Sequence, residues 1–191
     1  MQTIKCKGMP PQARDAYEKI VQFFFAFPQE EFSLNEIAKK LVIAKMTANR
    51  IVTKLEKEGF LQKKVIGKLW QVHANQSHKY FTTKKIPYNL QLVYESDIRE
   101  WITKNIKGIK TIIFFGSYRK GDDIRTSDLD IAVEVQNEQE QKIYEVKVEE
   151  MGYRKDIQMH IHCFSRKRID KNLFANIANG IILEGFLEVY S

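Results

Sequence analysis

The chain has 191 residues, of which 43% are hydrophobic and 29% charged; these ordinary values exclude disordered, collagen-like and coiled-coil proteins. Its apolar runs are far shorter than the ~20 residues of a membrane-spanning helix. Lys5 and Lys7 are followed by no apolar signal-peptide core, and the two cysteines, Cys6 and Cys163, lie far apart. We therefore expect a soluble cytoplasmic protein with no disulfide framework and no membrane partner.

Charge is distributed unevenly along the chain. Residues 1–85 hold 16 Lys and Arg against 7 Asp and Glu, a net charge of +9, whereas residues 86–191 hold 15 against 17, a net charge of −2. This asymmetry predicts two modules with different partners, and a basic module suits a phosphate-bearing ligand. The polar segment 75–87 is the expected boundary. The sequence predicts a first domain over residues 1–80, a linker with a connecting helix over 81–107, and a second domain over 108–191.

Two helices are predicted at the start of the basic module. Apolar residues at helical spacing over 13–27 indicate the first, which ends before Pro28. Its aromatic run 23–27 exceeds what one helical face needs, so we expect most of it to lie in the core and leave open that part of it forms a dimer interface. Ser33, three residues before Glu36, is a capping box that predicts a second helix to about residue 41.

A third helix and a hairpin follow. A tight turn over 42–46 leads to a helix that begins at residue 46 or 47 and ends near residue 58, with Gly59 as its C-terminal cap. Alternation over 60–66 and 69–72 predicts two strands joined at Gly67 and Lys68.

This order of elements resembles the winged helix-turn-helix superfamily, an α+β fold, over residues 32–72. In that family the outer face of the third helix enters the major groove, where Asn and Arg contact base edges and Thr and Lys contact phosphates. The matching residues here are Lys45, Thr47, Asn49, Arg50, Thr53 and Lys54, with Lys63, Lys64 and Lys68 on the wing. The resemblance implies binding of DNA or RNA through residues 1–85. Winged helices also dock proteins or dimerise, so a homodimer stays open.

The second module contains two carboxylates on one predicted strand. A helix over 88–106 leads to a buried strand over 110–115, and a further strand follows in the segment 127–135. Residues two apart in a strand share a face, so Asp128 and Asp130 lie side by side. Adjacent carboxylates resist joint ionisation unless a cation is bound, and Mg²⁺ prefers such oxygen ligands.

A glycine–serine pair directly follows the strand over 110–115. Gly116 permits close backbone approach, and the backbone N–H groups with the Ser117 hydroxyl can hold a phosphate. Arg119 and Lys120 lie close by and can neutralise further phosphate charge.

These residues resemble the nucleotidyltransferase superfamily of DNA polymerase β, and in particular its minimal prokaryotic members. The likeness covers about residues 108–190, including the segment 172–185, which is similar to the family's last helix and turn. It implies an α/β domain with a mixed sheet flanked by helices. It also implies transfer of a nucleoside monophosphate from a nucleoside triphosphate to an acceptor, with Asp128 and Asp130 as catalytic ligands of two Mg²⁺ ions.

The family usually adds a third carboxylate on a later strand. The predicted strand 155–163 carries Asp156, Gln158, His160 and His162 on its polar face. Asp156 is the only acid there, and we take it as the third catalytic and metal-binding residue. If the family position falls on Gln158 or His160 instead, the site lacks its third acid. His160 and His162 could bind a transition metal, but two histidines without a clear third ligand are more often incidental.

Two functions therefore remain open. The first is a Mg²⁺-dependent nucleotidyltransferase whose winged helix binds nucleic acid. The second is a DNA-binding regulator, or an antitoxin-like protein, whose nucleotidyltransferase fold senses nucleotide or binds a partner without catalysis. Because some minimal nucleotidyltransferases modify HEPN-domain toxins, such a toxin is a conceivable partner.

Overall fold

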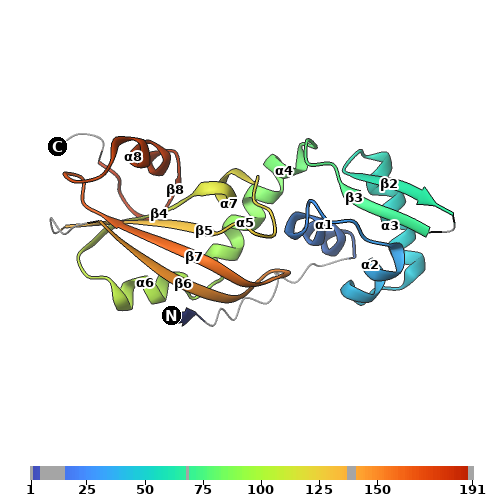
Figure 1. Ribbon diagram of the computed structural model, residues 1–191, viewed down its shortest axis with the longest axis horizontal. Coiled ribbons are helices and arrows are strands. Elements are labelled where there is room, and N and C mark those ends of the chain that lie inside the picture. The colour runs from blue at the N-terminus through green and yellow to red at the C-terminus, as the bar shows by residue number, and fades with distance from the viewer. Residues whose placement is uncertain (1, 5–15, 68, 137–140, 189–191) are drawn as a thin grey trace.

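The computed structural model describes residues 2–4, 16–67, 69–136 and 141–188. A winged helix lies at one end of the molecule and a six-stranded sheet at the other, with α4 (Tyr80–Thr83) and α5 (Lys85–Tyr94) between them (Figure 1). No helix in the described ranges is long and apolar enough to span a bilayer. The fold classes predicted for the two parts, an α+β winged helix and an α/β domain with a mixed sheet, are confirmed.

The winged helix has the predicted order of elements. They are α1 (Ala16–Ala26), α2 (Leu34–Leu41), α3 (Lys45–Lys57), β2 (Leu61–Ile66) and β3 (Leu69–Ala74). The capping box is confirmed, since Glu36 N donates to Ser33 Oγ (3.2 Å) and Ser33 N donates to Glu36 Oε2 (2.7 Å). Gly59 is also confirmed as the residue that ends α3, because it adopts φ +81° and lets Phe60 N donate to Leu55 O (3.0 Å).

The aromatic run of α1 is buried within the chain. Phe23, Phe24 and Phe25 are at most 3% exposed. The Phe25 ring lies 5.5 Å from that of Phe81 in α4 (Tyr80–Thr83), and Phe23 lies 5.8 Å from Tyr153 near the sheet. The last turn of α1 is apolar on all sides, and a helical segment of this kind is covered on all sides. The prediction that most of this run lies in the core is therefore confirmed; these three residues fill the space between the winged helix and the rest of the chain.

The single helix predicted over 88–106 is two helices, α5 (Lys85–Tyr94) and α6 (Ile98–Asn105). Ser96, which is 5% exposed, donates its hydroxyl to Val93 O (2.6 Å) and accepts from Ile98 N (3.4 Å). One side chain thus satisfies backbone groups of both helix ends, which the apolar spacing alone does not reveal.

The second part is a mixed sheet, as predicted. Its strands, in spatial order, are β1 (Gln2–Ile4), β6 (Lys142–Met151), β7 (Arg154–Phe164), β5 (Leu129–Val135), β4 (Ile109–Phe115) and β8 (Ile181–Gly185). Two pairs are parallel, β1 with β6 and β5 with β7, and the others are antiparallel. Residues 2–4 were assigned to the first domain, but they extend this sheet.

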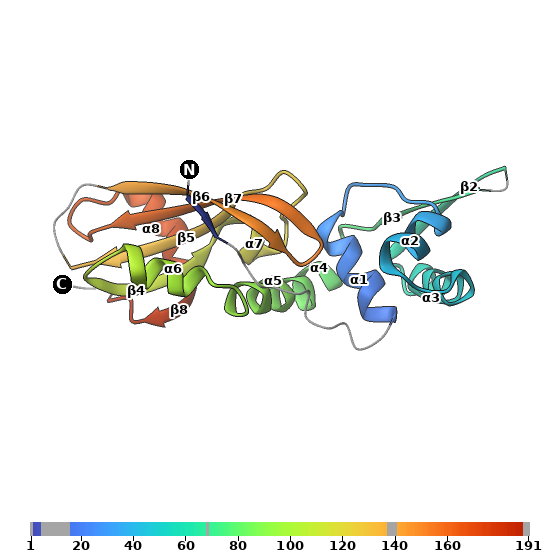
Figure 2. The ribbon, with the colours of Figure 1, turned by 90° about the horizontal axis from the view of Figure 1, so that it is seen from below.

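Helices cover both faces of the sheet (Figure 2). Residues of α5 and α6 pack on the face that contains Ile112 and Phe114. On the opposite face α8 (Lys171–Ala178) packs against Ile113, Phe115 and Ala132. Asp130 lies two residues before Ala132 and therefore on the α8 side of the sheet.

A buried arginine joins the two parts. Arg154, the first residue of β7, donates to the last carbonyls of α1, at Ala26 (2.8 Å) and Phe25 (3.3 Å). It also donates to Tyr118 Oη and Ile124 O, both at 2.8 Å. The same side chain therefore caps a helix of the winged-helix domain and holds the segment that leads into β5.

Arg154 belongs to a buried charged network around Asp123. The Asp123 carboxylate, 1% exposed, pairs with Arg154 and with Lys85 Nζ (3.1 Å), and accepts from Asn89 Nδ2 (2.8 Å). Burial lowers the pKa of Lys85 to about 8, although its interaction with Asp123 opposes this change.

Candidate active site

The turn between β4 and β5 brings a glycine against a carboxylate. Phe115 pairs with Asp130, so Gly116, the first residue of α7 (Gly116–Lys120), lies directly beside the Asp130 side chain. A Cβ at Gly116 would lie 2.2 Å from Asp130 Oδ2, and the backbone there has φ +78°. Glycine is therefore required on two grounds. Asp128, just before β5, is 46% exposed and Asp130 25% exposed, so both carboxylates remain accessible.

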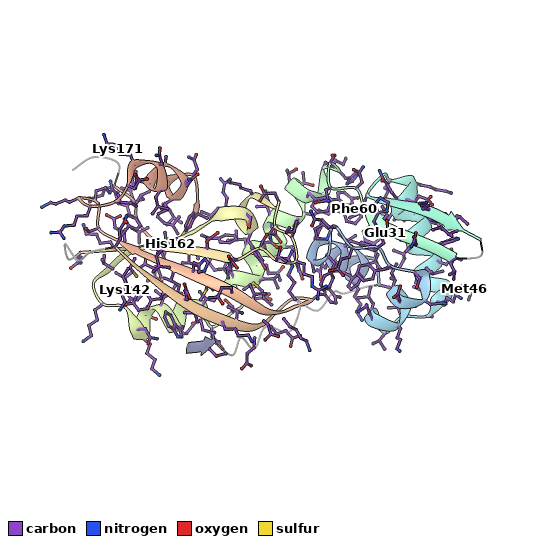
Figure 3. All side chains as sticks on the ribbon, in the orientation of Figure 1. Glu31, Met46, Phe60, Lys142, His162 and Lys171 are labelled. Carbon is purple, nitrogen blue, oxygen red and sulfur yellow. The ribbon has the colours of Figure 1, made fainter. Side chains whose placement is uncertain are left out.

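Two histidines of β7 complete this group. The parallel register places His160 beside Asp130 and His162 beside Ala132. His160 Nδ1 lies 3.8 Å from Asp128 Oδ2 and 3.9 Å from Asp130 Oδ1, and His162 Nε2 lies 3.8 Å from Asp130 Oδ1. Figure 3 shows His162 on the sheet, far from Met46 at the outer end of the winged helix.

The structure does not bring Asp156 to this group. Asp156 is four residues before His160 on β7, a separation of ~13 Å along a strand. Its carboxylate is 68% exposed and pairs with Lys147 Nζ at 2.7 Å. The place opposite Asp130 belongs to His160, the alternative position considered from the sequence. The expected third carboxylate is therefore missing from the described part of the site.

The other nucleotide-binding candidates lie on α7. Ser117 is half-buried, Arg119 is partly buried and Lys120 is exposed. Arg119 Nε is buried and forms no hydrogen bond within the described residues. Tyr118, between Ser117 and Arg119, is buried, and its Oη accepts a hydrogen bond from Arg154. This contact fixes the buried side of α7 to the rest of the protein.

Comparison with known families decides what these two parts are. Residues 95–175 match the nucleotidyltransferase domain family, and residues 28–65 match the MarR family. The chain joins a MarR-type winged helix to a nucleotidyltransferase domain. The nucleotidyltransferase match begins before α6, a helix that the sequence predicted to lie in the connecting segment. None of the curated proteins compared with the chain matches it.

The donor set of the nucleotidyltransferase domain fits one Mg²⁺ ion better than two. Asp128 and Asp130 offer the carboxylate oxygens that Mg²⁺ prefers, with open positions for waters and phosphate oxygens. A second Mg²⁺ ion would need a further carboxylate. The side chains present at that place are the imidazoles of His160 and His162, which suit transition metals instead.

The MarR-type winged helix exposes most of the predicted contact residues. Exposed positions on α3 are Lys45, Asn49, Arg50 and Lys54, with Thr47 and Thr53 partly buried among them; Lys64 is exposed on the wing. Lys63 is held within the protein instead, since its Nζ pairs with Glu56 (2.8 Å) and lies 4.2 Å from the centre of the Trp70 ring. Lys68 lies outside the described residues.

The sequence predicted that His160 and His162 lie on the polar face of their strand and could bind a transition metal, but it showed no third ligand for them. Their proximity to Asp130 depends on the register between β5 and β7, two strands separated by all of β6. Strand alternation predicts that the two histidines lie on the polar face of β7. Only the pairing of β7 with β5 shows that they lie beside Asp130.

Proposed function

We propose that the chain is a nucleotidyltransferase that takes a Mg²⁺-bound nucleoside triphosphate and transfers the nucleoside monophosphate to an acceptor. In this reaction an acceptor oxygen bonds to the α-phosphorus, the bond from that phosphorus to the oxygen bridging to the β-phosphate breaks, pyrophosphate leaves, and the acceptor proton passes to solvent. The observation that carries the proposal is the approach of Gly116 to Asp130 beside a second accessible carboxylate, Asp128.

Each residue has a distinct task in this proposal. Asp128 and Asp130 hold the ion, which when bound neutralises phosphate charge and orients the triphosphate. Gly116 lets the phosphates approach the backbone of the turn without a side chain between them. Arg119 and Lys120 supply positive charge on the same short helix, close to the phosphates.

The test compares two neutralised acids. Asp130→Asn is expected to abolish Mg²⁺-dependent pyrophosphate release, because it removes a ligand from the site while keeping the shape of the side chain. Asp156→Asn, on the exposed end of β7, is expected to leave release unchanged. Each labelled nucleoside triphosphate would be offered with DNA, RNA and a HEPN-domain protein as acceptors. Equal turnover by wild type and Asp130→Asn would refute the assignment.

For the winged helix we propose nucleic-acid binding through the exposed face of α3. Lys45, Arg50 and Lys54 are exposed along this helix, and the net charge of residues 1–85 is +9. The affinity of the whole chain for DNA or RNA is expected to fall steeply with salt, because bound cations are released from the phosphates. Arg50→Ala is expected to weaken binding, whereas Lys63→Ala, whose charge is paired with Glu56, should do so less. Affinity that does not change with salt would contradict this role.

A second candidate is supported by the histidine in place of the third acid. With His160 opposite Asp130, the domain could bind nucleotide without transferring it and serve a DNA-binding regulator as a sensor. The two candidates differ in one measurement. Pyrophosphate release supports the transferase, whereas nucleotide-dependent DNA affinity without release supports the regulator.

A further inference from the structure

Three donor groups converge on one point of the sheet without bonding to each other. Asp130 Oδ1 faces both imidazoles, with His160 Nδ1 at 3.9 Å and His162 Nε2 at 3.8 Å. These separations exceed hydrogen-bond length, and no described residue forms a hydrogen bond with any of the three side chains. Three partly buried polar groups in this arrangement have room for a shared partner between them.

The surroundings hold the three side chains in this orientation. Gly116 lies against Asp130 Oδ2, so the other oxygen, Oδ1, is the one turned to the imidazoles. His162 packs edge-on against Phe115, with ring centres 5.4 Å apart, and its neighbour across the sheet is the small Ala132. The ligand atoms therefore come from two paired strands, whose backbones are fixed by the sheet.

We propose that Asp130, His160 and His162 bind one divalent transition-metal ion, of the zinc or cobalt type, and that this site discriminates against Mg²⁺. Two imidazoles and one carboxylate form a ligand set that such ions favour, whereas Mg²⁺ requires oxygen ligands. The ion's place in the transfer reaction rests on the proposed function, but its binding is measured without nucleotide.

The distances are close to those of a metal site. Ligand atoms of a four-coordinate zinc ion lie ~2.1 Å from the metal and so ~3.4 Å from one another. One ligand atom from each of the three residues lies within 4.8 Å of the other two. Small side-chain rotations would close the remaining gaps. The three side chains are 18–28% exposed, which leaves a coordination position open to water or to an acceptor group.

The test is a cobalt titration of the full-length chain after treatment with a chelator. Visible Co²⁺ absorption reports coordination by nitrogen and oxygen ligands, and metal analysis after equilibrium dialysis gives the stoichiometry. We expect one ion per chain, displaced by Zn²⁺ but not by millimolar Mg²⁺. His160→Asn and His162→Asn are each expected to weaken binding at least ~100-fold, since even residues that only support metal ligands contribute 10–100-fold.

Two matched variants keep the test specific. His73→Asn changes a histidine of the winged helix that is hydrogen-bonded to Gln62, and Asp156→Asn changes an acid of the same strand, β7. Both are expected to bind Co²⁺ as wild type does. Undiminished binding by the His160→Asn/His162→Asn double variant, or equal competition by Mg²⁺, would overturn the proposal. If the chain binds Co²⁺ but transfers no nucleotide, the metal site is supported and only the proposed transferase function is refuted. If the chain shows Mg²⁺-dependent transfer but binds no Co²⁺, only the proposed metal site is overturned.

Discussion

Replacing Arg154 with Met is expected to separate the winged helix energetically from the nucleotidyltransferase domain. The Arg154 side chain is 5% exposed and reaches both parts. It donates to the last two carbonyls of α1, at Phe25 and Ala26, and pairs with the buried carboxylate of Asp123. Met fills similar space but donates no hydrogen bond.

The size of the effect follows from what the substitution leaves unpaired. Breaking a buried ion pair by removing one partner costs about 3–5 kcal/mol. Asp123 keeps Lys85 at 3.1 Å and Asn89 at 2.8 Å, which places the expected loss at the lower end, about 3 kcal/mol in the free energy of unfolding. That is a large fraction of the total stability of a domain.

The two tryptophans of the chain allow each part to be followed separately. Trp70 lies on β3 of the winged helix and Trp101 on α6 beside the sheet. Urea unfolding of Trp70→Phe and Trp101→Phe, followed by the remaining tryptophan, is expected to give one shared midpoint. After Arg154→Met the two midpoints are expected to separate, and the lower one to fall by about 1 M urea for a slope of about 3 kcal/mol per M.

Arg125→Met is the matched control, because Arg125 also joins the two parts. Its Nη1 lies 3.1 Å from Glu30 Oε1, but the side chain is 69% exposed. An exposed pair of this kind contributes about 0–1 kcal/mol, so little change is expected. If Arg154→Met left both midpoints where they are in the parent proteins, the buried network would not couple the parts.

Three further substitutions test single features of the fold. Gly116→Ala is expected to lower the transfer rate by about 100-fold, because its Cβ would displace Asp130. Gly67→Ala is the control and should leave the rate unchanged, since the space around its Cβ is open. Equal transfer rates for Gly116→Ala and wild type would refute the role of Gly116. Val42→Gly is expected to raise the free energy of unfolding by about 0.5–1 kcal/mol in urea titrations, because Val42 has φ +52° and is 88% exposed. Burial lowers the pKa of Lys85 from 10.5 to about 8. Between pH 8 and 10 the unfolded chain therefore keeps a proton that the folded chain releases. The free energy of unfolding should rise over this range by up to ~1.4 kcal/mol per pH unit. Lys85→Met should lack this rise when both proteins are unfolded across that range.

The features that the sequence predicted well are those set by neighbouring residues. Ser33 and Glu36 form their capping box from positions three apart, and Gly59 ends α3 within one turn. Asp128 and Asp130 share a face because successive side chains of a strand alternate. The fusion of a winged helix with a nucleotidyltransferase domain could be inferred from such local patterns.

The features that it missed depend on pairing between distant segments. β6 was not predicted, although its residues 144–149 alternate between apolar and polar side chains, and β1 could not be placed because its partner in the described sheet is β6. The position of Asp156, away from Asp130, could not be predicted for the same reason. Asp156 and His160 both lie on the polar face of β7, and the register with β5, which decides which of them meets Asp130, is a long-range property.

Arg154 and the two histidines of the proposed metal site lie on the same strand, β7. A shift of β7 by two residues would bring Gln158 opposite Asp130 and would move Arg154 ~6.6 Å from the α1 carbonyls that it contacts. The hydrogen bonds of Arg154 therefore oppose the displacement that would remove His160 from the site. Arg154→Met is thus expected to weaken Co²⁺ binding as well as stability, in a titration carried out far below the urea midpoint. Unchanged Co²⁺ affinity in that variant would show that pairing with β5 alone fixes the register.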